Sequence, residues 1–323
     1  MVGDGSMGAT LAHVIANGGR SCALWCADGA TAEAVNRERR HPARPRYELD
    51  ARVAATASLR EAVGGASLVV VAIGSPKFRE TARALGPLLR PEQVLLSATK
   101  GIELPGGTLM SELLRECTGA AAVGAIAGPN ITPEIMMGQL TAILVASPSR
   151  KAREMAEEAF GAGLQVHLSD DLRSVELASV LKNVVSIAIG IALGRGMGWN
   201  AQGLVFARAL AEVGTLLSAL GADAGVLNGI AGVGDIFLTA CSPQSLNRTM
   251  GMELGRGAKL DEVVAGLPEV PEGIGAVRGA RLLARRLGMR LPLCEVTAEI
   301  LEGEAPADAL ERVLMELPER SFT

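Results

Sequence analysis

The first half of the chain alternates short apolar runs with stretches of helical periodicity, and this alternation constrains the fold more than any other feature. Runs that are apolar on both faces are expected as buried strands over 22–26, 67–73, 94–98, 121–126, 141–146 and, last, 164–168. Helical patterns lie between them, for example over 9–17, 78–89 and 108–116. Strands that are buried on both faces are typical of a parallel sheet covered by helices, so we expect a doubly wound α/β domain.

The strand signals stop near residue 170, and the rest of the chain is typical of helices. We expect these helices over 172–194, 201–220, 245–255, 259–266, 272–287, 295–303 and 306–316. Gly, Pro and Asn separate them, as in loops between helices. The sequence therefore predicts two domains, a doubly wound α/β domain over 1–170 and an all-α domain over 171–323.

Composition narrows the classes of function. The net charge of −4 argues against a nucleic-acid partner, which normally requires a clustered basic excess. The chain has 3 histidines, which disfavours a histidine base or a multi-histidine metal site, and we expect no metal. The 5 cysteines show neither CxxC pairs nor a zinc spacing. There is no signal peptide pattern, and the longest apolar stretch, about 184–194, is too short to span a bilayer, so we expect a cytoplasmic protein.

A glycine-rich motif, Gly3-x-Gly5-x-x-Gly8, runs directly into an apolar helical segment. In dinucleotide-binding loops the first glycine makes the turn, the second admits the pyrophosphate, and the third lets helix and strand pack. Asp28 stands after the next predicted strand, 20 residues beyond Gly8, where a ribose-binding acid is expected. The alternative is a glycine turn with no ligand.

The strand that should precede this loop is reduced to Met1 and Val2. That strand lies at the centre of a doubly wound sheet. Either the chain starts late or the sheet is interrupted at its middle, and we expect a truncated start.

Residues 177–194 form a nearly all-apolar helical segment with one ionisable group, Lys182. Ser179, Lys182, Asn183 and Ser186 lie at spacings of three and four, so they share one face of the helix. An ammonium on a buried helix loses hydration, which makes it a plausible acid–base group. The alternative is a lysine whose stem packs while its head reaches water.

Several polar turns follow predicted strands or open predicted helices. Lys100-Gly101 and Gly128-Pro129-Asn130 each follow a strand, at the carboxyl edge where doubly wound folds bind ligands. Asp235 follows a glycine-rich loop, and 245–248 open a helix whose hydroxyl, amide and N–H groups suit a phosphate. Each turn alone is better explained as a capped turn, but their joint presence predicts a ligand site.

Taken in order, these residues resemble the bacterial NAD(P)-dependent glycerol-3-phosphate dehydrogenases. The matching motifs cover almost the whole chain: GxGxxG at 3–8, ATKG at 98–101, GPN at 128–130, LKNV at 181–184, AGVGD at 231–235, SLNR at 245–248 and VPEG at 270–273. The resemblance implies a Rossmann domain followed by a helical substrate domain. It also implies that Lys182 is the catalytic acid–base and that Lys100 contacts the substrate and sometimes the cofactor.

The same resemblance implies which other positions bind ligands. The substrate positions are Lys100, Gly128, Asn130, Lys182, Asp235, Ser245, Leu246 and Asn247. The cofactor positions, with the glycine loop and the acid included, are Gly3, Gly5, Ser6, Met7, Gly8, Asp28, Lys100, Val270 and Glu272.

The chain departs from the family pattern within these motifs. Asn130 stands where the family usually has Ser or Thr, and Ile131-Thr132 replaces Phe-Ala. Leu246 replaces an arginine that contacts phosphate groups. Arg248 is the nearby candidate to take its place, but each residue of shift turns a helical side chain by ~100°. Ala27, followed by Asp28, replaces a basic residue near the adenosine 2′ position, which favours NAD, with NADP still possible.

The predicted reaction is the reduction of dihydroxyacetone phosphate to sn-glycerol 3-phosphate for phospholipid synthesis. Lys182 would donate the proton, Lys100 would stabilise the developing charge, and Asp235 and Asn183 would hold the Lys182 ammonium. One alternative is a related reductase of another small oxo acid or phosphate, which the apolar Leu246 would suit. A second is a nucleotide-binding protein without turnover. A small-molecule phosphate is the expected partner, and formation of a homodimer is left open.

Overall fold

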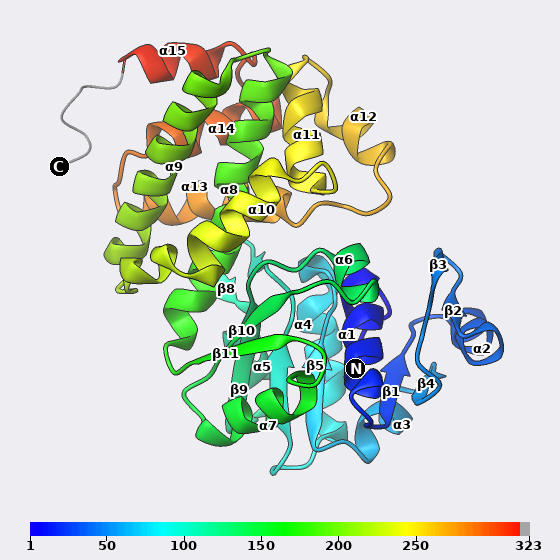
Figure 1. The fold of residues 1–323 in the computed structure, drawn as a ribbon. Helices are drawn as coiled ribbons and strands as arrows, with labels where there is room; N and C mark the ends of the chain where they lie inside the picture. Colours follow the sequence, from blue (N-terminus) through cyan, green and yellow to red (C-terminus); the bar gives the residue numbers. More distant parts are fainter. Residues whose placement is uncertain (317–323) are drawn as a thin grey trace. The chain divides into compact units, whose positions relative to one another are not determined.

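The computed structural model describes residues 1–316 and divides the chain into two compact units (Figure 1). Unit 1 comprises Met1–Lys100 and Thr108–Glu176, and unit 2 comprises Gly101–Gly107 and the chain from Leu177 onward. The limits expected from the sequence, 1–170 and 171–323, differ from this division at two places. The start of the long helix after residue 170 groups with unit 1, and 101–107 group with unit 2.

Unit 1 alternates strands and helices, and the expected strands are all present. Its strands are β1 (Cys22–Trp25), β2 (Arg40–His41), β3 (Arg44–Glu48), β4 (Val53–Thr56), β5 (Leu68–Val71), β6 (Val94–Ser97), β8 (Thr108–Leu109), β9 (Ala122–Ala127), β10 (Ala142–Ala146) and β11 (Gln165–Ser169). Its helices are α1 (Ser6–Asn17), α2 (Gly29–Glu38), α3 (Leu59–Gly64), α4 (Ser75–Leu85), the 3-10 turn η1 (Gly86–Leu88), α5 (Met110–Thr118), α6 (Thr132–Met136) and α7 (Arg150–Phe160).

The first two residues join two parts of the sheet. The strand order is β11-β10-β9-β6-β5 in one part and β1-β4 in the other, and Val2 bridges Val71 of β5 and Trp25 of β1 in parallel. Val2 N–H donates to the Val70 carbonyl at 2.8 Å, and Trp25 N–H donates to the Met1 carbonyl at 2.8 Å. Met1–Val2 thus occupy the position of the central strand, between β5 and β1.

One strand pair differs from the all-parallel expectation. β10 runs antiparallel to β9, with Leu144 opposite Ala127, and β11 is parallel to β10. The connection between β9 and β10 contains only the five-residue helix α6, which does not carry the chain back across the sheet. β10 therefore starts at the edge where β9 ends.

Part of the basic segment 37–46 forms a hairpin between β2 and β3. His41 of this hairpin places Nε2 3.4 Å from the Asp4 carboxylate, within the glycine-rich loop.

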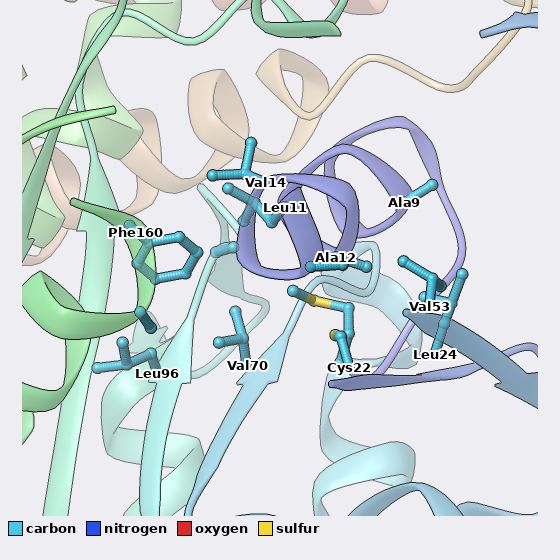
Figure 2. Packing of buried hydrophobic residues seen from close by; sticks show 14 of the residues in the cluster. Ala9, Leu11, Ala12, Val14, Cys22, Leu24, Val53, Val70, Leu96 and Phe160 are labelled. Carbon is cyan, nitrogen blue, oxygen red and sulfur yellow. The ribbon is translucent and has the colours of Figure 1, made fainter. Parts of the chain in front are cut away.

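The core of unit 1 forms where α1 packs on the sheet. Figure 2 shows Leu11, Ala12 and Val14 of α1 beside side chains of the strands, among them Val70 of β5. These residues are at most 5% exposed. The apolar face of α1 thus holds this helix against the sheet. The glycine loop before α1 lies at the strand ends, where Rossmann folds bind a nucleotide.

Unit 2 is helical apart from the short strand β7 (Ile102–Glu103). Its elements are α8 (Leu172–Gly194, which begins in unit 1), α9 (Trp199–Ala219), the 3-10 turn η2 (Ala224–Asn228), the π turn η3 (Ile230–Gly234), α10 (Asp235–Cys241), α11 (Leu246–Gly255), α12 (Leu260–Ala265), α13 (Gly273–Arg286), α14 (Pro292–Glu302) and α15 (Ala309–Glu316). The expected helices are present. η2 and η3 lie in the glycine-rich segment before Asp235, and α10 follows it where no helix was expected.

α8 has the bounds expected from the sequence. It has 23 residues and an apolar window with a mean hydropathy of 1.8, which would suffice to cross a membrane by length and composition. However, 89% of its apolar window is buried within the protein, as in a core helix. The long run of apolar residues in α8 is therefore explained by packing.

A cavity of about 800 Å³ lies beside Met1. Met1, Cys22, Ala23, Leu68 and Val70 contribute to its lining. The Met1 ammonium donates to the Ala23 carbonyl at 2.7 Å, and burial lowers the pKa of this amino group.

Glu176 is a buried carboxyl group in unit 1. Its two oxygens accept hydrogen bonds from the Ser111 N–H at 2.9 Å and the Ser111 hydroxyl at 2.5 Å. Burial nevertheless raises its pKa from 4.5 to about 7. The folded protein therefore binds this proton more tightly than the unfolded chain does.

The free energy of unfolding should consequently fall as the pH rises from about 4.5 to about 7. Glu176→Gln keeps an acceptor for Ser111 and removes the titration, so wild type should lose about 3 kcal/mol more than this variant across that range. Urea unfolding at pH 5 and pH 8 measures the difference. Glu154→Gln, a change at an exposed carboxylate of α7 that pairs with Arg150, should keep the wild-type slope. An unchanged slope in Glu176→Gln would refute the assignment.

Candidate active site

The glycine loop of unit 1 has the backbone geometry that a phosphate-binding turn requires. Gly3 has φ +110°, and a Cβ there would lie 2.4 Å from the Ala72 carbonyl oxygen. A Cβ on Gly8 would lie 1.9 Å from the Gly3 carbonyl oxygen. A Cβ on Gly5 would meet nothing within 4 Å, so this residue faces open space. The first and third glycines are thus required by packing, and the second leaves room for a ligand.

The N-terminus of α1 follows this loop directly. Gly5 is the N-cap, and within the described chain no side chain caps this end of the helix. Ser6 and Met7 are its first residues, and both are half-buried. Backbone N–H groups and the helix dipole favour an anion at such a terminus. Loop and helix together therefore fit the pyrophosphate of a dinucleotide.

Asp28 follows β1, as expected, and caps α2. Its carboxylate accepts hydrogen bonds from Thr31 N–H at 2.9 Å, Thr31 Oγ1 at 2.8 Å and Ala30 N–H at 3.3 Å. The hydroxyl of Thr31, and then the two backbone donors, lower the pKa of this exposed carboxyl. The side chain is therefore a carboxylate at neutral pH, with part of its accepting capacity already used.

Lys100, Gly128 and Asn130 lie at the carboxyl ends of β6 and β9, which are neighbours in the sheet. Lys100 Nζ donates to the Gly128 carbonyl at 2.8 Å, so the structure brings these two predicted residues together. Gly128 has φ +104°. Asn130 Nδ2 donates to the Ala142 carbonyl at 3.3 Å, which ties it to β10.

In unit 2, Lys182 is held in a buried polar cluster. Its Nζ donates to Asp235 Oδ1 at 2.6 Å and to Thr239 Oγ1 at 2.6 Å. The Lys182 and Asp235 side chains are 6% and 1% exposed. The sequence left open the alternative of a lysine whose head reaches water. The structure excludes this alternative, because the Lys182 side chain is buried. Two oriented partners instead fix the position of the ammonium.

The position of Asp235 depends on the glycine-rich segment before it. Asp235 is the first residue of α10 and follows the π turn η3. Within that turn a Cβ on Gly232 would lie 2.2 Å from the Leu227 carbonyl oxygen, so only glycine fits. Thr239 lies one helical turn after Asp235, and its Oγ1 also approaches the Asp235 carbonyl at 2.7 Å. Sequence reasoning missed Thr239, which the spacing of four from Asp235 could have indicated.

The start of α11 packs beside α8. Ser245 is the N-cap, and its Oγ accepts from the backbone N–H of Arg248 at 3.2 Å. Asn247 donates from Nδ2 to Asn183 Oδ1 at 2.9 Å and accepts from Gly273 N–H at 3.1 Å. Asn183, which was expected to help hold the ammonium, thus contacts Asn247. Leu246, between the cap and Asn247, is half-buried.

The two remaining cofactor positions precede α13. Val270 is 68% exposed and Glu272 is half-buried at the N-cap of that helix. The described residues contain no cluster of three or more His, Cys, Asp or Glu side chains that could hold a metal ion.

A glycine loop that opens α1 against a central strand, with a second helical unit that carries a buried lysine–aspartate pair, defines a Rossmann-type dehydrogenase with a helical C-terminal domain. The chain belongs to the NAD-dependent glycerol-3-phosphate dehydrogenase family. The family model for the N-terminus matches residues 1–153, and the model for the C-terminus matches residues 171–311.

Individual relatives agree with this membership. A glycerol-3-phosphate dehydrogenase [NAD(P)+] of Alcanivorax borkumensis is 34% identical over 317 residues, 98% of this chain and 92% of the relative. The crystal structure of glycerol-3-phosphate dehydrogenase from Coxiella burnetii matches with a TM-score of 0.91 and 28% identity, over 99% of this chain and 98% of the other. A ketopantoate reductase structure from Ralstonia eutropha shares the fold, with a TM-score of 0.64 and 16% identity over 95% of this chain and 97% of the other.

Proposed function

We propose that this protein reduces dihydroxyacetone phosphate to sn-glycerol 3-phosphate, which serves phospholipid synthesis, and that Lys182 is the general acid. The buried Lys182 ammonium, held at 2.6 Å by both Asp235 and Thr239, is the observation that carries the proposal. Family membership supports the substrate and the cofactor.

Reduction of the substrate carbonyl places negative charge on its oxygen. Lys182 donates a proton to that oxygen, and the reverse reaction returns the proton to Lys182. Asp235 keeps the lysine charged before the transfer and fixes its direction. Lys100 is proposed as a second cation that stabilises the charge on the oxygen and orients the carbonyl. NADH, when bound, supplies the hydride for the carbonyl carbon.

Nucleotide contacts are proposed within each unit separately. Gly3, Gly5 and Gly8 shape the loop, and the α1 N-terminus at Ser6 and Met7 receives the pyrophosphate. The contacts outside the loop are proposed for Asp28, Lys100, Val270 and Glu272. A carboxylate at Asp28 repels a 2′-phosphate, so we propose NAD as the preferred cofactor and NADP as the weaker one.

The substrate contacts are proposed for Lys100, Gly128, Asn130, Lys182, Asp235, Ser245, Leu246 and Asn247. Location in the cytoplasm stays a prediction, as does the homodimer.

A second candidate is a reductase of another small oxo acid, which the apolar Leu246 favours because it suits a less anionic substrate. A steady-state panel that compares dihydroxyacetone phosphate with 2-oxo acids, each with NADH and with NADPH, separates the two. Higher kcat/KM for a 2-oxo acid would favour the second candidate. Absence of NADH oxidation with every panel member would favour a nucleotide-binding protein without turnover.

Lys182→Met should lower kcat by at least ~10²-fold, because it removes the proton donor. The change also leaves the buried Asp235 carboxylate without its ammonium, which should destabilise the fold by about 3–5 kcal/mol. The double variant Lys182→Met/Asp235→Asn removes that charge, so it should recover stability without recovering turnover. Stopped-flow and steady-state rates, with melting temperatures, make the comparison. Near-normal turnover in either variant would remove Lys182 from the mechanism.

A further inference from the structure

The glycine loop of unit 1 contains a carboxylate, Asp4. This residue stands between Gly3 and Gly5, and a Cβ on Gly5 would meet nothing within 4 Å. Consecutive Cα atoms lie about 3.8 Å apart, and charges act over about 8 Å at physiological ionic strength. A negative charge at Asp4 therefore opposes the binding of an anion at this loop and at the N-terminus of α1.

Asp28 places a second carboxylate near the end of β1. The thiol of Cys26, which follows β1 and is buried, is influenced by both carboxylates. Burial, then Asp4 and then Asp28 raise the pKa of this thiol to about 12. Cys26 is therefore neutral at physiological pH and offers no charge. Two negative charges thus lie where Rossmann folds bind the pyrophosphate and the ribose of a dinucleotide.

His41 of the β2–β3 hairpin contacts the first of these carboxylates. Its Nε2 lies 3.4 Å from Asp4 Oδ2, and the two side chains are 11% and 26% exposed. Its Nδ1 accepts a hydrogen bond from the Ala43 N–H at 3.1 Å. In the neutral ring Nε2 therefore carries the hydrogen and donates to Asp4. When Nδ1 also takes a proton, the ring gives up the bond from Ala43 and cancels the charge of Asp4.

Two arginines close to His41 in the chain pair with carboxylates of their own. Arg40 pairs with Glu48, and Arg37 pairs with Glu38. The further ionisable residues of α2, of the hairpin and of the end of β1 are Glu33, Arg39, Arg44, Arg46, Tyr47, Cys26 and Asp28. Asp4 forms its ion pair with His41, so the charge of this imidazole decides whether the charge of Asp4 is compensated.

The chain has two other histidines, and both lie in different surroundings. His13 of α1 accepts a hydrogen bond from the Asp50 N–H at 3.0 Å, and burial lowers its pKa. His167 is exposed on β11, at the edge of the sheet. Imidazole is the side chain whose charge ordinarily changes between pH 5 and 8. Of the three histidines, His41 is the one in contact with the glycine loop.

From these contacts we infer that His41 is a positioning residue of the dinucleotide site: it holds the Asp4 carboxylate and, when protonated, neutralises it, which strengthens binding of the cofactor pyrophosphate. The inference rests on the proposed function and deepens it, because it assigns control of cofactor affinity to two residues outside the predicted set. Cofactor binding is then tighter where His41 is charged than at higher pH. By reciprocity, a bound pyrophosphate favours the protonated ring.

The test measures the binding of ADP-ribose by isothermal titration calorimetry at pH 6 and pH 8.5. This probe carries the pyrophosphate and the adenosine of the cofactor without the nicotinamide, and its charge is constant over that range. The variants are His41→Gln, His41→Lys and Asp4→Asn. His167→Gln is the matched control, because it removes an exposed histidine of the same unit. Melting temperatures show that each variant is folded, and steady-state reduction of dihydroxyacetone phosphate measures activity.

Wild type should bind ADP-ribose about three- to fivefold more weakly at pH 8.5 than at pH 6, the effect of a partly exposed charge pair. His41→Gln should bind at both pH values as wild type does at pH 8.5, because its side chain does not titrate. His41→Lys should keep the tight binding at pH 8.5, since its ammonium stays charged. Asp4→Asn should bind more tightly than wild type at pH 8.5. His167→Gln should match wild type at both pH values.

The outcomes separate this inference from the proposed reaction. A wild type that reduces dihydroxyacetone phosphate but binds ADP-ribose equally at the two pH values would overturn the inference alone. A His41→Gln protein that loses affinity equally at both pH values would also overturn it, since the histidine would then only support the hairpin. So would Asp4→Asn binding no tighter than wild type at pH 8.5. A wild type that shows the predicted pH dependence but reduces no ketone would overturn the proposed reaction and keep the inference.

Discussion

The ion pair between Lys182 and Asp235 is the interaction on which the helical unit depends. Two charges that are at most 6% exposed are tolerated only when each compensates the other and hydrogen bonds satisfy what remains. Thr239 supplies such a bond, and the surrounding apolar residues of α8 exclude water from the pair. Burial of the ammonium costs free energy, but the same two partners, Asp235 and Thr239, fix its charge and its orientation. A proton donor requires both.

Glycine backbone geometry then sets where the functional groups of each unit can lie. In unit 1 the crowded Gly3 and Gly8 hold α1 against the central strand, and the open Gly5 leaves space for a phosphate. In unit 2 the crowded Gly232 shapes the turn that delivers Asp235. α8 and α11 approach closely because glycines face each other across them, which fixes the first turn of α11 beside Asn183. The excess of glycine in the sequence thus has a specific meaning in each unit.

Most of the fold could be predicted from the sequence, because the spacing of apolar residues indicates which residues are buried and in which kind of element. The strands β1, β5, β6, β9, β10 and β11 and the long helices of unit 2 were indicated, and so was the pairing of Asp235 with Lys182. The short strands β2, β3, β4 and β8 were not indicated. The antiparallel direction of β10 was not, since strand direction depends on the path of the chain and not on apolar pattern. The short helical turns η2 and η3 were not predicted because the glycine-rich segment that contains them resembles a loop. The short helix α10, which follows this segment, was not predicted either.

A crystal structure of the protein with NAD and glycerol 3-phosphate tests the central claim most directly. The account predicts Lys182 Nζ within about 3 Å of the hydroxyl oxygen on the central carbon of the substrate, with Asp235 still bonded to the same ammonium. A hydroxyl oxygen held by another group, with Lys182 beyond hydrogen-bond reach and bonded only to Asp235 and Thr239, would contradict it.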